Sequence, residues 1–181
     1  MIRKLVAGGA LMLLGLTLPA SAALKPGQLA PTFAARASLG GKAFDFALST
    51  ALAKGPVVLY FYPAAFTPGC TLEAHNFAQH IGAFKKYGAT VIGVSHDSIA
   101  TLNKFGVSEC RSKFAVAADP DLKIARRYDS VLKLAPSLAD RVSYVIDRDG
   151  KIAYVYRAMN PEKHVSNALA ALKTLAHGRM H

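Results

Sequence analysis

The sequence predicts one α/β domain with a mixed central β-sheet flanked by helices and an N-terminal β-hairpin. Runs of β-branched and aromatic residues alternate with stretches whose apolar residues recur at helical spacing, which is typical of parallel βαβ units. Two later strand-like runs flank an Asp-Gly turn, which adds an antiparallel hairpin. The 181 residues, 52% of them hydrophobic and 18% charged, suffice for one buried core but not for two ordinary domains.

The first 22 residues are typical of a cleavable export signal. Arg3 and Lys4 provide a basic start, residues 5–18 are mostly apolar, and small residues in 19–22 suit a cut after Ala22. An uncleaved anchor is the alternative, but the apolar run is shorter than the roughly 20 residues that a spanning helix needs. We therefore expect a mature domain over residues 23–181, periplasmic or secreted and without stable membrane insertion, in a compartment where disulfides persist.

The domain is expected to begin with two short strands and a buried strand. Residues 25–37 contain two prolines and suit an extended entry with a short strand near Phe33. After a Gly-Gly turn, residues 42–47 alternate with a period of two and suit a hairpin partner for that strand. Residues 56–62 are a continuous β-branched and aromatic run, which predicts a strand buried on both faces in the middle of the sheet.

Alternating helices and strands are expected next. An apolar stripe that starts after Cys70 predicts a helix ending at Gly88, and residues 90–95 predict a second core strand. Asp97 or Ser98 is suited to cap the following helix. The remaining elements are expected as a strand at 114–117, a short helix opened by Asp119-Pro120, a hairpin of 142–146 with 151–156, and an amphipathic helix begun by Asn160-Pro161.

Charge and cysteine content exclude several classes of protein. The net charge of +11 comes from lysines and arginines scattered along the chain, without a basic tract or nucleic-acid-binding motif, so we expect no nucleic-acid partner. Only two cysteines are present, Cys70 and Cys110. This number excludes a disulfide-dense scaffold and a four-thiolate metal site.

Cys70 is the strongest candidate for chemistry because it lies between the end of a buried strand and the start of a helix. The unpaired N–H groups and the positive pole of a helix N-terminus favour an anion, which stabilises the reactive thiolate. In open α/β sheets, ligands also tend to bind at the carboxyl ends of the strands. The alternative is a buried structural cysteine that acts as a small apolar side chain.

The motif Pro63-x-x-x-Thr67-x-x-Cys70 resembles the active-site signature of peroxiredoxins, which are thiol peroxidases with a thioredoxin-like fold. The residues around it, 60–74, are similar to the bacterioferritin-comigratory branch of that family, and further similarity extends over residues 25–176. The expected order of strands and helices is also that of a thioredoxin-like α/β sandwich.

The resemblance implies a role for each motif residue. Cys70 would be the peroxidatic nucleophile, Thr67 a hydroxyl partner for sulfur and peroxide, and Pro63 a shield over the pocket. Arg141 would be the active-site arginine, favouring the thiolate and holding a peroxide oxygen as negative charge develops. Glu73 would orient Arg141, although a carboxylate near a helix N-terminus is also explained by the helix dipole. Structural explanations remain for the others: a turn cap for Thr67, a strand end for Pro63 and a surface ion pair with Asp140 or Asp147 for Arg141.

Cys110 is the candidate for resolving the sulfenic acid that peroxide attack would leave on Cys70. Many relatives in the branch carry a resolving cysteine at the position occupied here by His75, whereas others carry it on the helix after the second core strand, where Cys110 lies. The resemblance thus implies an intramolecular disulfide, which requires local unwinding near Cys70. A partner subunit's cysteine, or a one-cysteine mechanism with Cys110 as a bystander, are the alternatives.

The predicted function is therefore an exported thiol-dependent peroxidase for hydrogen peroxide and organic hydroperoxides. The resemblance implies a monomer recycled by a thioredoxin-like or glutaredoxin-like reductant, without a cofactor. Cys70 and His75 alone would make a poor metal site, so we expect no metal. A thiol-disulfide oxidoreductase or copper-delivery protein is less favoured because no Cys-x-x-Cys motif is present, and a disulfide-stapled binding domain is the non-enzymatic alternative.

Overall fold

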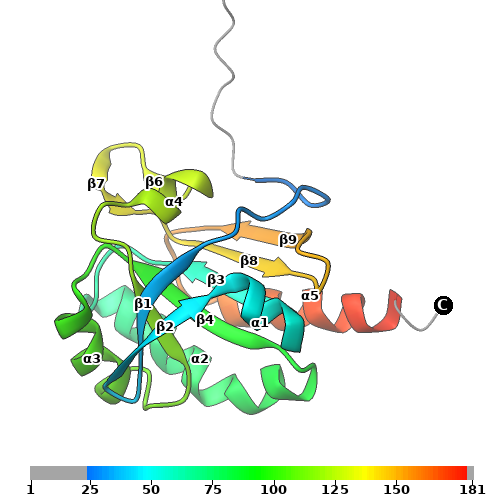
Figure 1. The fold of residues 1–181 in the computed structure, drawn as a ribbon, viewed down its shortest axis with the longest axis horizontal. Helices are drawn as coiled ribbons and strands as arrows, with labels where there is room; N and C mark the ends of the chain where they lie inside the picture. The colour runs from blue at the N-terminus through cyan, green and yellow to red at the C-terminus, as the bar shows by residue number, and fades with distance from the viewer. Residues whose placement is uncertain (1–23, 179–181) are drawn as a thin grey trace, which may run out of the picture.

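A seven-stranded mixed sheet forms the centre of the computed structural model, which describes residues 24–178 (Figure 1). In spatial order the strands are β2 (Lys42–Ala47), β1 (Ala34–Leu39), β5 (Ala115–Ala118), β4 (Thr90–Ser95), β3 (Val57–Phe61), β8 (Val142–Ile146) and β9 (Ile152–Arg157). Strands β3, β4 and β5 run parallel, and the other neighbouring pairs are antiparallel. The predicted mixed sheet and its two parallel crossovers are confirmed.

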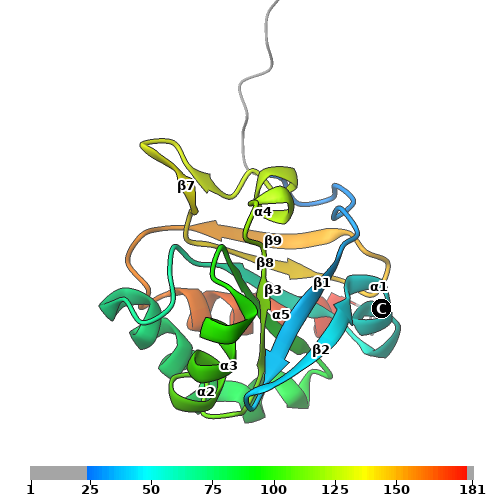
Figure 2. The ribbon, with the colours of Figure 1, turned by 60° about the vertical axis from the view of Figure 1, so that its left-hand side comes forward.

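Helices cover both faces of this sheet. On one face, α2 (Pro68–Lys86), α3 (Ile99–Ser108) and α5 (His164–Gly178) pack on a cluster that contains both cysteines. On the other face lie α1 (Leu48–Lys54) and α4 (Lys123–Arg127). A small hairpin of β6 (Val131–Leu132) and β7 (Ala135–Ala139) projects beside α4 (Figure 2).

Strand β3 is buried on both faces, as predicted. Val57, Leu59 and Phe61 point into one apolar cluster, whereas Val58 and Tyr60 point into the other. This alternation is the period-two geometry of a strand. The middle strand of the seven is β4, so β3 is an interior strand next to the centre rather than the centre itself.

Several predicted boundaries are reproduced by the structure. Strands β2, β4 and β8 have the expected limits, and β1 with β2 forms the expected hairpin. Ser98 caps α3 by accepting a hydrogen bond from the Thr101 backbone at 3.2 Å. Asp97 instead accepts a 2.7 Å hydrogen bond from the Ala65 backbone and thereby ties the loop before α2 to the end of β4.

Two helices begin later than predicted. α4 begins at Lys123, because the carboxylate of Asp119 accepts hydrogen bonds from the backbones of Ile124 and Ala125, at 3.1 and 2.8 Å, and so caps the helix from a distance. The turn between them places Leu122 in the left-handed region, at φ 53°. α5 begins at His164, since the side chain of Asn160 accepts a 3.0 Å bond from the Glu162 backbone in a turn.

Helix α1 and the β6–β7 hairpin were not predicted. α1 is capped by Ala47 without a side-chain hydrogen bond, so no capping residue marks its start. The predicted export signal, residues 1–22, lies outside the described residues. None of the helices in the described range 24–178 is both long and apolar enough to cross a membrane.

Candidate active site around Cys70

Cys70 lies in the first turn of α2, just beyond the carboxyl end of β3. Thr67 is the N-cap of the helix and Pro68 its first residue, where a missing N–H costs nothing. The thiol side chain is buried, with Cys70 only 2% exposed. The predicted position of Cys70 at the N-terminus of a helix, where the positive end of the helix dipole lies, is confirmed.

Arg141 lies against Cys70 and is held on three sides. Its Nη2 donates to the Cys70 sulfur at 3.3 Å, and its Nε donates to the Met159 carbonyl at 3.0 Å. Its Nη1 donates to the carboxylate of Glu73, on the same helix as Cys70. Arg141 is 3% exposed, so the surface ion pair considered from the sequence is wrong. Asp140 instead pairs with Arg157, at 2.7 Å.

Glu73 is fully buried, which raises the pKa of its carboxyl above the usual range. Desolvation is the main cause, and the charge and hydrogen bond of Arg141 counteract it in part. One carboxylate oxygen meets Arg141, whereas the other, Oε1, has no hydrogen-bond partner and lies 3.5 Å from Nδ1 of His164. The predicted contact between Glu73 and Arg141 is therefore present in the structure.

His164 lies beside Glu73, on the side away from Arg141's hydrogen bond, and was not predicted as a site residue from the sequence. Its Nε2 lies 2.8 Å from the Ala158 carbonyl, which can only accept, so this nitrogen carries the proton. Nδ1 then accepts from the Ser143 hydroxyl at 2.8 Å. Burial lowers the pKa of His164 to about 4, so the ring is neutral at pH 7. A single buried histidine at the start of a predicted helix carries no spacing signal that could have marked it.

Gly69 is a second residue that sequence analysis missed. A Cβ atom added there would lie 3.1 Å from Nη2 of Arg141, which is tighter than an ordinary contact. Glycine therefore leaves room for the guanidinium beside the first turn of α2, although glycine is a weak helix former. Its place directly before Cys70 was the available signal.

Thr67 and Pro63 belong to the loop that leads into α2. The Thr67 hydroxyl is exposed and donates to the Ala64 carbonyl at 2.9 Å rather than to sulfur, which leaves its lone pairs free to accept a hydrogen bond. Pro63 is buried, and its carbonyl oxygen lies 2.8 Å from Nδ1 of His96. Both residues precede Cys70; the contact with His96 ties Pro63 to the segment after β4, whereas the Thr67 contact lies within the loop itself.

Cys110 follows the end of α3 and is fully buried in the same apolar cluster as Cys70. Both cysteines are free thiols. Burial raises the pKa of the Cys110 thiol far above its usual value, and the neighbouring charge of Glu109 adds to this effect. Nε2 of His75, from the second turn of α2, lies 2.8 Å from the carboxylate of Glu109. His75 therefore connects the helix of Cys70 to the residue before Cys110.

Within residues 24–178, no group of three or more His, Cys, Asp or Glu side chains is arranged to hold a metal ion. A buried thiol that accepts a hydrogen bond from a fixed guanidinium, just beyond the carboxyl end of an interior strand, is an arrangement typical of the reactive cysteines of thiol-dependent redox proteins.

Comparison with known proteins identifies the family. Residues 26–155 match the model of the AhpC/TSA family. The chain is 37% identical over 151 residues to chloroplastic peroxiredoxin Q of Oryza sativa subsp. japonica, covering 82% of this chain and 67% of that protein. The crystal structure of peroxidoxin BcpB from Mycobacterium tuberculosis superposes with a TM-score of 0.76 at 31% identity, over 84% of this chain and 98% of that one. The structure of peroxiredoxin Q from Xanthomonas campestris superposes with a TM-score of 0.68 at 30% identity, over 78% of this chain and 90% of that one.

The chain belongs to the AhpC/TSA family and is a peroxiredoxin of the bacterioferritin-comigratory branch. This confirms the resemblance noted in the sequence and the thioredoxin-like fold class. The protein is therefore an enzyme, a thiol peroxidase.

Proposed function

We propose that Cys70 is the nucleophile of this peroxidase and that Arg141 is its principal partner. The observation that carries the proposal is the 3.3 Å hydrogen bond from Arg141 Nη2 to the Cys70 sulfur at the N-terminus of α2. A guanidinium and helix dipoles next to one sulfur favour the thiolate, which is the attacking species. Hydrogen peroxide and organic hydroperoxides are the proposed substrates.

In the proposed reaction, the Cys70 thiolate attacks one peroxide oxygen and the O–O bond breaks. The sulfur is oxidised to a sulfenic acid, and the leaving oxygen takes up a proton and departs as water or an alcohol. Arg141 stabilises the negative charge that develops on the leaving oxygen. Thr67 accepts a hydrogen bond from the peroxide through its free lone pairs, and the buried ring of Pro63 keeps bulk water from the sulfur.

Glu73 acts in this proposal as a positioning residue. Its carboxylate holds Nη1 of Arg141, so that Nη2 stays directed at Cys70. Oε1 of Glu73 lies 3.5 Å from Nδ1 of His164 without a hydrogen bond, and Glu73 has no contact with solvent. The guanidinium is thereby preorganised before peroxide enters, which is the arrangement that lowers a barrier most effectively.

Cys110 is the proposed resolving thiol. Its sulfur would attack the sulfenic acid of Cys70, forming a disulfide and releasing water. The segments around both cysteines must open first, since Cys110 is fully buried. Phe66, at φ 64°, and Arg111 and Ser112, at φ 49° and 54°, flank the two thiols in the left-handed region. Such residues cost about 1–2 kcal/mol each, and this cost is released when the segments open.

A thioredoxin-like or glutaredoxin-like dithiol is the proposed reductant of the disulfide. It would be oxidised to its own disulfide as Cys70 and Cys110 return to thiols. Both cysteines belong to one chain and one apolar cluster, which supports a complete cycle in a monomer. In that case, non-reducing electrophoresis of the oxidised enzyme shows a monomeric band at every dilution.

Export is proposed from the sequence alone. Residues 1–22 carry the basic start, apolar run and small residues of a secretion signal. The mature protein should then be recovered from the periplasm or medium with Ala23 as its first residue. A cytoplasmic protein that retains Met1 would contradict this proposal.

The decisive experiment measures peroxide consumption and recycling in matched variants. Cys70→Ser should abolish turnover, whereas Cys110→Ser should keep one rapid turnover and then stop, with Cys70 trapped as sulfenic acid. The burial of Cys110 favours one alternative, the one-cysteine mechanism. Continued turnover of Cys110→Ser with a dithiol reductant would establish that alternative, and full activity of Cys70→Ser would reject the peroxidase site.

A further inference from the structure

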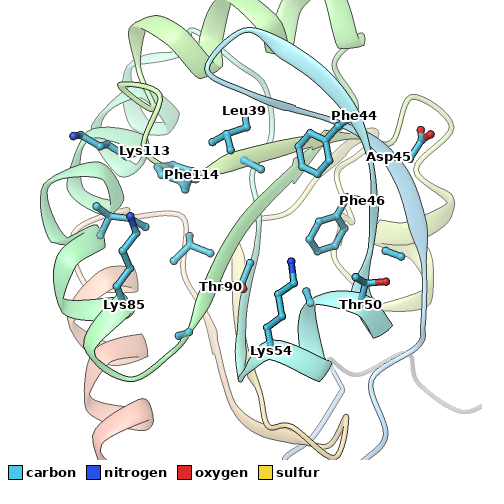
Figure 3. Close-up of a pocket in the computed structure, with 16 residues that line it drawn as sticks. Leu39, Phe44, Asp45, Phe46, Thr50, Lys54, Lys85, Thr90, Lys113 and Phe114 are labelled. Atoms are coloured by element: carbon cyan, nitrogen blue, oxygen red, sulfur yellow. The ribbon is translucent and has the colours of Figure 1, made fainter.

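A cavity of about 560 Å³ opens at the end of the sheet opposite Cys70 (Figure 3). It lies between β2, α1, the last part of α2 and the first residues of β4 and β5. Cys70 follows the carboxyl end of β3, which runs parallel to β4, so the cavity is not part of the peroxidase site. Its volume falls within the range of about 300–1,000 Å³ that is common for small-molecule sites.

The walls of the cavity are mainly apolar. Phe46 and Phe114 belong to the apolar clusters on opposite faces of the sheet, and Phe44 and Leu39 extend the wall toward solvent. Leu39 is 45% exposed. Apolar surface in contact with water is unfavourable by about 25 cal/mol per Å², so a ligand with an apolar body gains free energy by covering it.

Three lysines belong to the lining, Lys54, Lys85 and Lys113, and Figure 3 shows the ammonium group of Lys113 directed outward at the edge of the cavity. Among the described residues, none of the three ammonium groups has an ion pair or a hydrogen bond. The one acidic residue of the lining, Asp45, is engaged with Arg36 at 2.9 Å, and Figure 3 shows its carboxylate directed away from the cavity. The cavity therefore carries positive charge that the protein itself does not neutralise.

The helix dipole explains the placement of only two of these three lysines. Lys54 and Lys85 lie in the last turns of α1 and α2, where cations are favoured in any helix. Lys113 lies outside any helix, two residues before β5. Lys86 shares the last turn of α2 with Lys85 but does not line the cavity. Lys86 is therefore a matched control for the effects of helix dipole and net charge.

We propose that this cavity binds an amphipathic carboxylate, namely a free fatty acid of medium or long chain. The alkyl chain would lie against Phe44, Phe46 and Phe114, and the carboxylate would meet the ammonium groups at the rim. A small inorganic anion would leave the apolar wall uncovered, and a neutral alkyl compound would leave the lysines without a counter-charge. The proposal does not depend on the peroxidase chemistry.

The test measures binding of dodecanoate to the full chain by isothermal titration calorimetry, below the micelle concentration. We expect saturable binding of about one dodecanoate per chain, weaker binding of dodecanol and none of acetate. Lys85→Gln should weaken dodecanoate binding by about threefold to tenfold, through loss of a partly solvated charge-assisted contact. Lys86→Gln should leave the affinity unchanged.

Several results would overturn the proposal. Equal losses in Lys85→Gln and Lys86→Gln would indicate non-specific attraction to a basic protein. Binding to phosphatidylglycerol vesicles without binding of monomeric dodecanoate would indicate a membrane surface instead of a fatty-acid site. Cys70→Ser should bind dodecanoate like the wild type, which keeps this test separate from that of the peroxidase site.

Discussion

Replacing Arg141 with methionine removes the cation from the Cys70 sulfur while keeping a side chain of similar length. The lost contact is the 3.3 Å hydrogen bond from Nη2 to sulfur. A hydrogen bond to a charged group contributes about 1.5–3 kcal/mol, so the rate constant with hydrogen peroxide should fall by about 10- to 150-fold. Stopped-flow competition with a second peroxidase at pH 7 measures this rate constant.

Stability has to be measured beside the rate, because Arg141→Met also removes the partner of Glu73. Glu73 can take up a proton in response, since burial raises its pKa and Arg141 is the group that opposes this rise. Glu73→Gln is the matched variant, because its amide oxygen can still accept from Arg141. It should lose less rate than Arg141→Met. A rate constant for folded Arg141→Met within threefold of the wild type would refute the role of the guanidinium.

Three other predictions concern the residues around this pair. His75→Ala removes the 2.8 Å contact with Glu109 and should speed disulfide formation after a peroxide pulse by about twofold to fivefold, as measured by acid quench and mass spectrometry. An unchanged rate of disulfide formation would contradict a restraining role for His75. Gly69→Ala should slow peroxide reduction by about tenfold, because its Cβ would displace the guanidinium of Arg141. The thermal midpoint of unfolding should not fall, because alanine has a higher helix propensity than glycine. An unchanged rate of peroxide reduction would show that the guanidinium has room to shift. The pKa of His164 is lowered from 6.5 to about 4, so the folded state binds fewer protons than the unfolded state between these values. Urea unfolding should therefore show stability falling from pH 6.5 to pH 4, with a smaller fall in His164→Gln, and equal slopes would contradict a neutral buried ring.

The parts of the fold that sequence could predict are those in which local pattern and tertiary environment agree. Strand β3 is apolar at every position because both of its faces are covered, and Ser98 caps α3 through a contact three residues away. α4 and α5 began late because Asp119 and Asn160 use their side chains in turns before the helix starts. The prediction placed those residues at the cap itself, which the hydrogen bonds contradict.

Site residues could be predicted from the sequence where a motif contains them, but not where residues distant in sequence meet only in the folded structure. Cys70 and Arg141 are far apart in sequence, and the family resemblance supplied their pairing. His164, the first residue of α5, lies close to Glu73 of α2, and no spacing in the sequence indicates that contact. The cavity with Lys54, Lys85 and Lys113 was missed for the same reason, since its lysines come from three separate segments.

The most direct test of the central assignment identifies the sulfur that peroxide oxidises. The Cys110→Ser variant should receive one equivalent of hydrogen peroxide in the presence of dimedone, followed by peptide mass spectrometry. Cys70 should carry the dimedone adduct, its sulfenic acid should form at least about a hundredfold faster than that of free cysteine, and Cys70→Ser should carry no adduct. An adduct on Cys110 in Cys70→Ser at the same rate, or an unreactive Cys70 in the folded enzyme, would contradict it.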